Sequence, residues 1–235
     1  MTQATSSSQK VLVFDFGAQY GQLIARRVRD LNVYSEIVPC DITADEVREM
    51  APSAIILSGG PASVNAEDAP RVDPAIYELG VPVLGFCYGH QITAVTLGGS
   101  VFHPEVGEYG AAELHVNGGA LFEGTPADQT VWMSHFDAVR DVPEGFTVVA
   151  STDVCPVAAM ENAEKRIFTT QFHPEVKHTE YGQQILSNFL FNICGLEKNW
   201  TMDNLVESMT ADFRETVGED RVILSGIHEY YEPEE

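Results

Sequence analysis

From residue 11 onward the chain alternates short apolar runs with amphipathic segments, and this alternation limits the possible folds more than any other feature. The apolar runs predict strands at residues 11–14, 35–39, 54–57 and 81–86. Helical spacing or helix-start residues predict helices between and after them, at residues 22–31, 43–50, 74–80 and 90–97. Strands that alternate with helices in this way predict a mostly parallel central sheet flanked by helices.

After Gly99 the pattern changes to short strands separated by turns that contain Pro and Gly, which predicts additional antiparallel strands. We expect these strands at residues 101–102, 111–116, 130–133, 148–150, 157–160 and 167–172. A helix at 181–193 should follow and end at Gly195. The expected fold class is therefore α/β, with a mostly parallel central sheet, flanking helices and additional antiparallel strands.

Charge and cysteine content exclude several classes of protein. The formal net charge of −22, from 13 Lys and Arg against 35 Asp and Glu, argues against binding to nucleic acid or to an anionic membrane surface. No apolar run approaches the roughly 20 residues that span a bilayer, and residues 1–10 lack the apolar segment of a secretory signal. The four cysteines form no CxxC pair, so the sequence suggests neither a zinc site nor a disulfide framework. We expect a cytoplasmic protein without a metal site.

Residues 85–89 read Gly-Phe-Cys-Tyr-Gly and stand between a predicted strand and a predicted helix. This is the pattern of a nucleophile elbow with Cys in place of Ser, in which the glycines make room for a sharp strand-to-helix turn. The turn would place the Cys87 sulfur at a helix N-terminus, where the helix dipole favours the thiolate. A buried cysteine on a tight turn is the simpler alternative, but the order of strand, elbow and helix favours a nucleophile.

A cysteine nucleophile needs a base, usually a histidine oriented by a carboxylate, and the chain holds two identical candidates. Residues 102–106 and 172–176 both read Phe-His-Pro-Glu-Val. In each copy Pro keeps the preceding His extended, so that the His and the Glu two residues later can point the same way. The pattern by itself does not choose between His103 and His173. The longer predicted strand before His173 favours the second copy.

The remaining histidines are weaker candidates for the base. His90 lies three residues after Cys87, but a packing or helix-surface role is the better interpretation. The others lack a paired acidic residue in a comparable setting in the sequence, namely His115, His135, His178 and His228.

Two loops contain groups that fit a site next to Cys87. The Ser-Gly-Gly-Pro turn at 58–61 follows a predicted strand and could direct backbone N–H groups at a developing oxyanion. The polar cluster at 132–137 also follows a strand and could recognise a small polar substrate. Each signal is weak alone and gains weight from the neighbouring elbow.

Residues 11–195 resemble the class I, triad-type glutamine amidotransferases, and within that family they are most similar to the amidotransferase domains of GMP synthetases. The segments that carry the resemblance follow one another in the family's order, at residues 14–20, 25–29, 55–61, 87–89, 132–135 and 171–179. The resemblance implies a flavodoxin-like α/β fold.

The resemblance also implies roles for individual residues. Cys87 would be the nucleophile, His173 the base and Glu175 the partner that orients the base. Backbone amides of Gly60 and Tyr88 would form the oxyanion hole. The residues around bound L-glutamine would be Gly59, Gln91, Ser134, His135 and Asp137. On this interpretation His103 and Glu105 are incidental, and His90 is tolerated without a catalytic role.

The resemblance breaks off near the C-terminus. In GMP synthetases a linker helix and a strand lead into an ATP-pyrophosphatase loop, and residues 224–226, Leu-Ser-Gly, begin that pattern before it stops at Ile227. We expect four segments, which are a flexible tail at 1–10, the amidotransferase domain at 11–197, a linker helix with the truncated start of an ATP-pyrophosphatase domain at 198–226, and a tail outside the family pattern at 227–235.

The implied function is hydrolysis of L-glutamine through a Cys87 thioester. The ammonia would serve a synthetase domain that aminates XMP to GMP in purine biosynthesis. That partner would bind ATP and Mg²⁺, whereas the glutaminase half, which we expect to be monomeric, needs no cofactor. Two alternatives stay open: a non-catalytic glutamine-binding or regulatory module, and the glutaminase component of another amidotransferase, such as that of anthranilate or carbamoyl-phosphate synthesis.

Overall fold

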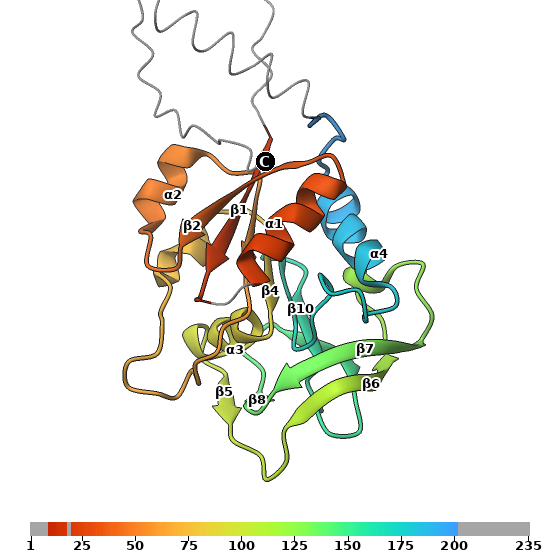
Figure 1. Ribbon diagram of the computed structural model, residues 1–235. Helices are drawn as coiled ribbons and strands as arrows, with labels where there is room; N and C mark the ends of the chain where they lie inside the picture. Colours follow the sequence, from red (N-terminus) through yellow and green to blue (C-terminus); the bar gives the residue numbers. More distant parts are fainter. Residues whose placement is uncertain (1–8, 18–19, 202–235) are drawn as a thin grey trace, which may run out of the picture. The chain divides into compact units, whose positions relative to one another are not determined.

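The computed structural model describes residues 9–17 and 20–201 of the 235-residue chain (Figure 1). Most of the expected linker segment at 198–226, most of the expected N-terminal tail and the whole expected tail at 227–235 lie outside these residues. Within the described part, no helix combines the length and apolar character that crossing a membrane requires.

A nine-stranded sheet runs through the molecule, in the order β2-β1-β3-β4-β11-β10-β9-β6-β7. The first five strands of this order are parallel to one another, and the other four are antiparallel to their neighbours. The parallel strands are β1 (Lys10–Asp15), β2 (Tyr34–Pro39), β3 (Ala54–Leu57), β4 (Val83–Phe86) and β11 (Ile167–Thr170). The others are β6 (Glu108–Val116), β7 (Asp128–His135), β9 (Thr147–Ser151) and β10 (Ala159–Asn162). The expected α/β fold is confirmed.

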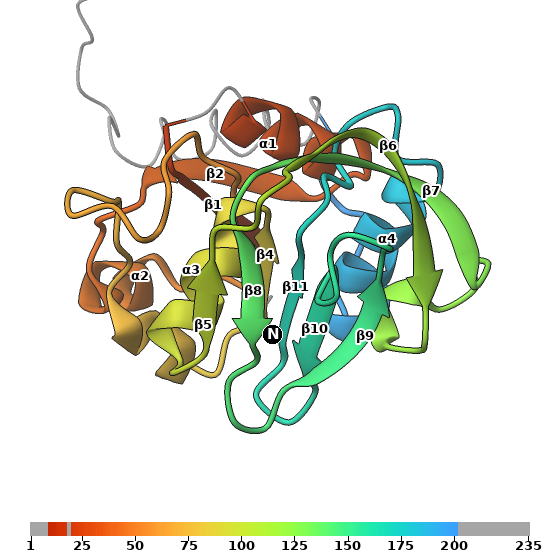
Figure 2. The same ribbon diagram turned by 90° about the horizontal axis from the view of Figure 1, so that it is seen from below.

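Helices cover both faces of the parallel part because its strands are apolar on both sides. In β1, Val11 and Val13 belong to one core cluster, whereas Leu12 and Phe14 belong to another. The first cluster includes side chains of α1 (Tyr20–Asp30), α4 (Gly182–Ser187) and the following π-helical turn η3 (Asn188–Ile193). The second includes side chains of α2 (Ala44–Met50), η1 (Pro74–Glu78) and α3 (Tyr88–Thr96), and Figure 2 shows α2 and α3 across the sheet from α1.

A small separate sheet pairs β5 (Ser100–Phe102) with β8 (Ala138–Asp141) in antiparallel orientation. It packs against α3, and a short 3-10 turn, η2 (Ala120–Phe122), lies against η3. The sequence did not predict β8, because its Ala-Val-Arg-Asp segment is too short to show a period and its partner is distant in the chain. The predicted helix at 74–80 is a 3-10 turn, and the one at 181–193 continues from α4 as a π-helical turn.

The topology sets the position of the candidate site. In a parallel sheet the carboxyl ends of the strands meet at one edge, where α/β proteins bind ligands. The segments that follow β3, β4 and β11 at this edge contain Gly59, Cys87 and His173, respectively.

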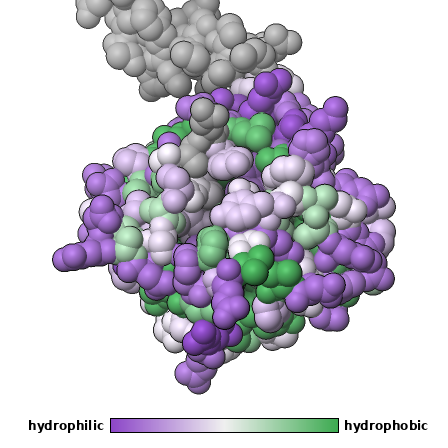
Figure 3. Space-filling view, turned by 60° about the horizontal axis from the view of Figure 1, so that its bottom comes forward, coloured by the Kyte–Doolittle hydropathy of each residue, from purple (hydrophilic) through white to green (hydrophobic). Residues whose placement is uncertain are grey.

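The face in Figure 3 is mostly hydrophilic with small hydrophobic patches. In the described chain the large hydrophobic side chains that stay exposed are Val106, Tyr109 and Val154.

Candidate active site

Cys87 lies in a strained turn between β4 and α3. Its φ of 50° and ψ of −100° put it in a backbone region that residues other than glycine rarely adopt, and it caps the N-terminus of α3. The two flanking glycines allow this turn by close approach. A Cβ at Gly85 would lie 2.6 Å from the Gly89 carbonyl oxygen, and one at Gly89 would lie 2.4 Å from the Leu57 carbonyl oxygen. The spacing of glycines in the elbow is therefore a steric requirement of the turn.

The thiol of Cys87 is held between two loops. Its Sγ lies 3.7 Å from the carbonyl oxygen of Ser134, which accepts from the thiol. A Cβ on Gly59 would lie 3.6 Å from the Cβ of Cys87 and 3.0 Å from Cε1 of His173, so both side chains border this glycine. Cys87 and His173, 86 positions apart in the sequence, thus face the same small space.

His173 and Glu175 form a buried pair. The Nδ1 atom of His173 lies 2.8 Å from Oε1 of Glu175, and both residues are 1% exposed. Nδ1 carries the hydrogen because the ionised carboxylate only accepts. The other ring nitrogen, Nε2, makes no hydrogen bond of normal geometry among the described residues. It is therefore free to exchange a proton with the thiol or with a bound molecule.

Two opposed effects set the charge of His173. Burial alone would lower the pKa of the imidazole, but interactions with Cys87 and with Glu175 outweigh burial and raise that pKa well above its ordinary value. An imidazolium at this position stabilises a thiolate beside it. The arrangement can therefore supply both a nucleophile and a proton donor.

Several contacts fix the loop that contains this pair. The backbone N–H of His173 donates to the Trp132 carbonyl oxygen at 3.1 Å, and the Thr179 hydroxyl donates to the His173 carbonyl oxygen at 2.7 Å. The Arg27 Nε donates to the Glu175 carbonyl oxygen at 3.0 Å. The ring of Tyr20 packs on the imidazole with centroids 4.6 Å apart. The three hydrogen bonds fix the backbone at His173 and Glu175, and the Tyr20 ring limits movement of the imidazole.

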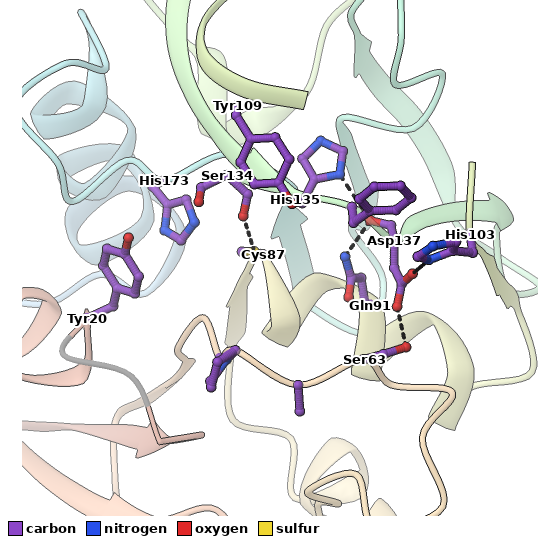
Figure 4. A pocket seen from close by; sticks show the side chains of 14 residues that line it. Tyr20, Ser63, Cys87, Gln91, His103, Tyr109, Ser134, His135, Asp137 and His173 are labelled. Carbon is purple, nitrogen blue, oxygen red and sulfur yellow. Dashed lines mark hydrogen bonds and ion pairs between the residues drawn. The ribbon is translucent and has the colours of Figure 1, made fainter. Parts of the chain in front are cut away.

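A pocket of about 390 Å³ is lined by Cys87 and His173. Figure 4 shows the side chains around it. Gly60 lies on its wall, and a Cβ there would lie 3.0 Å from the Phe16 carbonyl oxygen, so a larger residue would require the backbone at Phe16 to shift. Tyr88 is the first residue of α3, where backbone N–H groups have no partner within the helix. Both predicted oxyanion-hole residues are therefore adjacent to Cys87 in space.

The structure brings together the polar residues expected around a substrate. Gln91, Ser134, His135 and Asp137 all line the pocket. The Gln91 Nε2 donates to the carbonyl oxygen of Asp137 at 2.7 Å and to Oε1 of Gln171 at 3.1 Å. These bonds fix the floor of the pocket between α3 and the β7–β8 turn.

The first Phe-His-Pro-Glu-Val copy has a different environment. The His103 side chain is 68% exposed, and its Nδ1 lies 2.7 Å from Oδ1 of Asp137, not from Glu105. Glu105 is exposed. His103 nevertheless lines the same pocket as Cys87, so the structure brings it closer to the site than the sequence suggested.

His90 is fully buried and bonded on both ring nitrogens, to the Thr169 hydroxyl at 2.8 Å and to the Val157 carbonyl oxygen at 3.1 Å. Burial lowers the pKa of its imidazole to about 3, so it stays neutral. It packs behind the elbow and does not line the pocket.

Two of the other histidines have acidic partners that the sequence around them did not indicate. His115 pairs with Asp128 at 2.8 Å on the surface, and His135 Nε2 lies 3.3 Å from Oε2 of Glu108 in a buried position. These partners come from neighbouring strands, so spacing along the chain did not reveal them. His178 is exposed and its ring packs on Trp132 at 4.7 Å, and His228 lies outside the described residues.

Several residues that line the pocket were not predicted individually as site residues. They come from different parts of the fold. Tyr20 begins α1, Tyr109 belongs to β6, and Ser63 and Phe136 lie in loops. Tyr20 belongs to one of the segments that carry the family resemblance, which was the available signal. Phe136 belongs to the cluster at 132–137 that the sequence singled out, whereas for Ser63 the sequence holds no comparable signal.

Two groups of side chains in the described chain have metal-ligand chemistry within 4.8 Å, namely Glu108, His135 and Cys155, and Glu113, His115 and Asp128. In the first group Glu108 is already bonded to His135 and to the Thr152 hydroxyl at 2.9 Å, and burial raises the pKa of the Cys155 thiol to about 12. The second group is a surface cluster with a His–Asp pair. Neither arrangement favours a metal over the contacts already made.

Comparison with known proteins is consistent with this geometry. Residues 12–193 match the class-I glutamine amidotransferase family. The chain is 53% identical over 221 residues to the glutamine-hydrolysing GMP synthase of Clostridium acetobutylicum, covering 93% of this chain and 43% of that protein. It is 56% identical over 227 residues to the corresponding synthase of Streptomyces avermitilis, covering 95% of this chain and 43% of that protein.

Among solved structures, a Thermoplasma acidophilum protein assigned provisionally as one of the subunits of GMP synthase superimposes with a TM-score of 0.69 at 30% identity. The match covers 86% of this chain and 98% of that one. The chain therefore spans less than half the length of the two bacterial synthases, and it covers nearly all of the archaeal protein.

Proposed function

The chain belongs to the class I glutamine amidotransferase family, and from that membership and the geometry of the pocket we propose that it hydrolyses L-glutamine to glutamate and ammonia. Cys87 is the nucleophile, His173 the general acid and base, and Glu175 the residue that orients the imidazole. The observation that supports this most directly is the position of Cys87 on a strained helix-start turn beside a buried His173–Glu175 pair.

The reaction proceeds in two halves. The Cys87 thiolate attacks the side-chain amide carbon of glutamine, and the backbone N–H groups of Gly60 and Tyr88 stabilise the oxyanion. The His173 imidazolium gives its proton to the amide nitrogen, the C–N bond breaks, and ammonia leaves a glutamyl thioester on Cys87. Neutral His173 then takes a proton from water, the resulting hydroxide attacks the thioester, and glutamate leaves as the thiolate–imidazolium pair is restored.

The pocket chemistry fits the amino-acid end of glutamine. Asp137 presents a carboxylate for the α-ammonium group, and Gln91, Ser134 and His135 border the same space. Gly59 borders Cys87 and His173, and a Cβ there would lie 3.0 Å from Cε1 of His173, so a glycine at this position allows the close approach of the imidazole.

The product ammonia, in this proposal, is used by a synthetase partner that aminates XMP to GMP at the expense of ATP. The identity to two GMP synthases supports this step, as does the 43% share of each that the chain matches. We place the reaction in the cytoplasm. ATP and Mg²⁺ belong to the partner in this scheme.

Covalent trapping tests the glutaminase proposal. The chain is incubated with a diazo-ketone analogue of glutamine, and the adduct is located by peptide mass spectrometry with L-glutamine as competitor. We expect an adduct on Cys87 that L-glutamine suppresses. The other cysteines in the described chain, Cys40, Cys155 and Cys194, are internal controls. Equal labelling of Cys40, or labelling of Cys87 that glutamine does not slow, would contradict the proposal.

The alternative of a non-catalytic glutamine-binding module predicts a different result. Such a module would bind L-glutamine without a reactive Cys87, so the folded chain would show glutamine binding and no adduct. Buried His173 and Glu175 favour the enzyme, because a module that only binds glutamine has no need to desolvate an ionisable pair beside a cysteine.

A further inference from the structure

We propose that His103, with Ser63, is a positioning residue that holds the Asp137 carboxylate for the α-ammonium group of the substrate, and so makes the pocket specific for an α-amino acid. This inference rests on the proposed glutaminase function and adds a determinant of substrate specificity. His103 belongs to the first of the two repeated motifs, which the proposed hydrolysis does not use.

The Asp137 side chain is fixed by two different loops. Its Oδ1 lies 2.7 Å from Nδ1 of His103, which follows β5, and its Oδ2 accepts from the Ser63 hydroxyl in the loop after β3. Figure 4 shows the carboxylate between these two groups, at the wall of the pocket that contains Cys87. The Asp137 side chain is only 7% exposed, so water replaces these contacts poorly.

Asp137 lacks a full cationic partner in the described chain. Its ion-pair neighbour there is the imidazole of His103, and no lysine or arginine of that part lines the pocket. A carboxylate that is almost buried attracts a cation, because the penalty for desolvating its charge is only partly offset by neutral hydrogen bonds. A primary ammonium group of the substrate satisfies this requirement through the remaining lone pairs of Oδ1 and Oδ2.

The orientation of His103 does not come from burial. Its ring stacks on Phe136 with centroids 4.0 Å apart and an interplanar angle of 19°. Phe136 in turn packs over Gly107, where a Cβ would lie 3.0 Å from Cδ2 of the phenyl ring. An imidazole that is 68% exposed is thus held by one aromatic face and one hydrogen bond, both at the pocket wall. A residue needed only for folding would more commonly have a buried ring.

The test uses two ligands that differ only in the group concerned. L-Glutamine and 4-carbamoylbutanoate share the amide and a carboxylate, but the second lacks the α-ammonium. Binding is measured by titration calorimetry on a Cys87→Ala chain, in which turnover cannot occur. His103→Ala is added to this background. His103→Asn serves as the conservative variant, because its side-chain N–H can replace the Nδ1 hydrogen. Glu105→Gln, at an exposed position of the same motif, is the matched control.

We expect His103→Ala to weaken L-glutamine binding about tenfold, as for loss of a hydrogen bond to a charged group, while binding of 4-carbamoylbutanoate changes less than about twofold. His103→Asn should recover part of the lost affinity for L-glutamine, and Glu105→Gln should leave the affinity for both ligands unchanged. Ser63→Ala, like His103→Ala, should weaken binding of L-glutamine more than binding of 4-carbamoylbutanoate.

Equal weakening of both ligands would overturn the inference, because it would show a general effect on pocket shape. An unchanged affinity for L-glutamine would overturn it as well. Failure of the proposed function is recognised separately, since then Cys87 of the unsubstituted chain takes no glutamine-protected adduct, whether or not the Cys87→Ala chain binds L-glutamine.

Discussion

Residues 102–106 and 172–176 have the same five side chains in the same order, and the fold gives them opposite environments. His173 is 1% exposed and bonds to the Glu of its own motif, at 2.8 Å. His103 is 68% exposed and bonds to Asp137, which is 34 positions away, while Glu105 of its own motif faces solvent. A His-Pro-Glu segment therefore does not define a His–Glu pair by itself.

The difference comes from the strand that precedes each copy. β11 is a central strand between β4 and β10, so the chain that leaves it enters the interior beside the Cys87 elbow. β5 is one of two strands of a small separate sheet, and the chain that leaves it runs over the surface. Burial forces the His and Glu of the second copy to satisfy each other, because no water is available to either. The exposed Glu105 has no such constraint.

The largest contrast is expected from alanine at the two histidines. His173→Ala should lower kcat for glutamine hydrolysis by about 10³-fold or more, because it removes both the acid and the base. His103→Ala should change kcat less than about threefold and act mainly on KM. Steady-state kinetics of ammonia release measures both. A larger fall in kcat for His103→Ala than for His173→Ala would reverse our assignment of the two copies.

The two glutamates give a smaller contrast. Glu175→Gln should lower kcat about 10²-fold, because the amide keeps the size of the side chain but removes the charge that stabilises the imidazolium. Glu105→Gln is the matched control at the exposed position, and its kcat should equal that of the parent. Equal kcat values for the two variants would mean that Glu175 has only a structural role.

Two glycines next to the motifs test how tightly each copy is packed. A Cβ at Gly182 would lie 2.0 Å from the Pro174 carbonyl oxygen, whereas at Gly107 the nearest atoms would be a Tyr109 ring carbon at 2.8 Å and the His135 carbonyl oxygen at 2.9 Å. The overlap with the backbone is much deeper at Gly182, so Gly182→Ala should destabilise the fold by about 3 kcal/mol and Gly107→Ala by about 1 kcal/mol. Urea denaturation followed by circular dichroism measures both. The reverse order would show that the second copy is the more adaptable one.

The smallest effect concerns pH and uses His90 as a reference for the buried His173. Because burial lowers the pKa of folded His90 to about 3, the unfolded chain binds more protons than the folded chain below about pH 6.5. Stability from this residue is therefore present above that pH and is lost as the pH falls, by about 2 kcal/mol between about pH 7.5 and about pH 5. His90→Gln should show a correspondingly flatter pH dependence of the unfolding free energy.

Nitrogen-detected NMR of the imidazoles checks the same contrast directly. At about pH 7 His90 should show one protonated ring nitrogen and His173 two, since interactions with Cys87 and Glu175 raise the pKa of His173. A neutral His173 in the ligand-free chain would contradict the proposed thiolate–imidazolium pair.

Much of the fold could be predicted from local pattern. The strands at 11–14 and 54–57 and the capped helix after Thr43 have strong periodic or capping signals, and the structure has β1, β3 and α2 there, with the Thr43–Glu46 capping box formed. The elbow was equally clear, because Gly85, Cys87 and Gly89 form a short continuous pattern. The requirement for Gly85 is local to the turn, whereas Gly89 is required by the Leu57 carbonyl oxygen of β3. The pairing of β4 with β11, and the extension of the parallel sheet by antiparallel strands, carried no such signal.

The sequence by itself determined the α/β class, the elbow around Cys87 and the two candidate histidines, because propensity, periodicity and close glycine spacing act over a few residues. Only the tertiary structure decided which histidine is desolvated against a glutamate and which one reaches Asp137 at the pocket wall. The physical reason is that burial and hydrogen-bond partners depend on neighbours in space, and here those neighbours are contributed by strands and loops many positions apart.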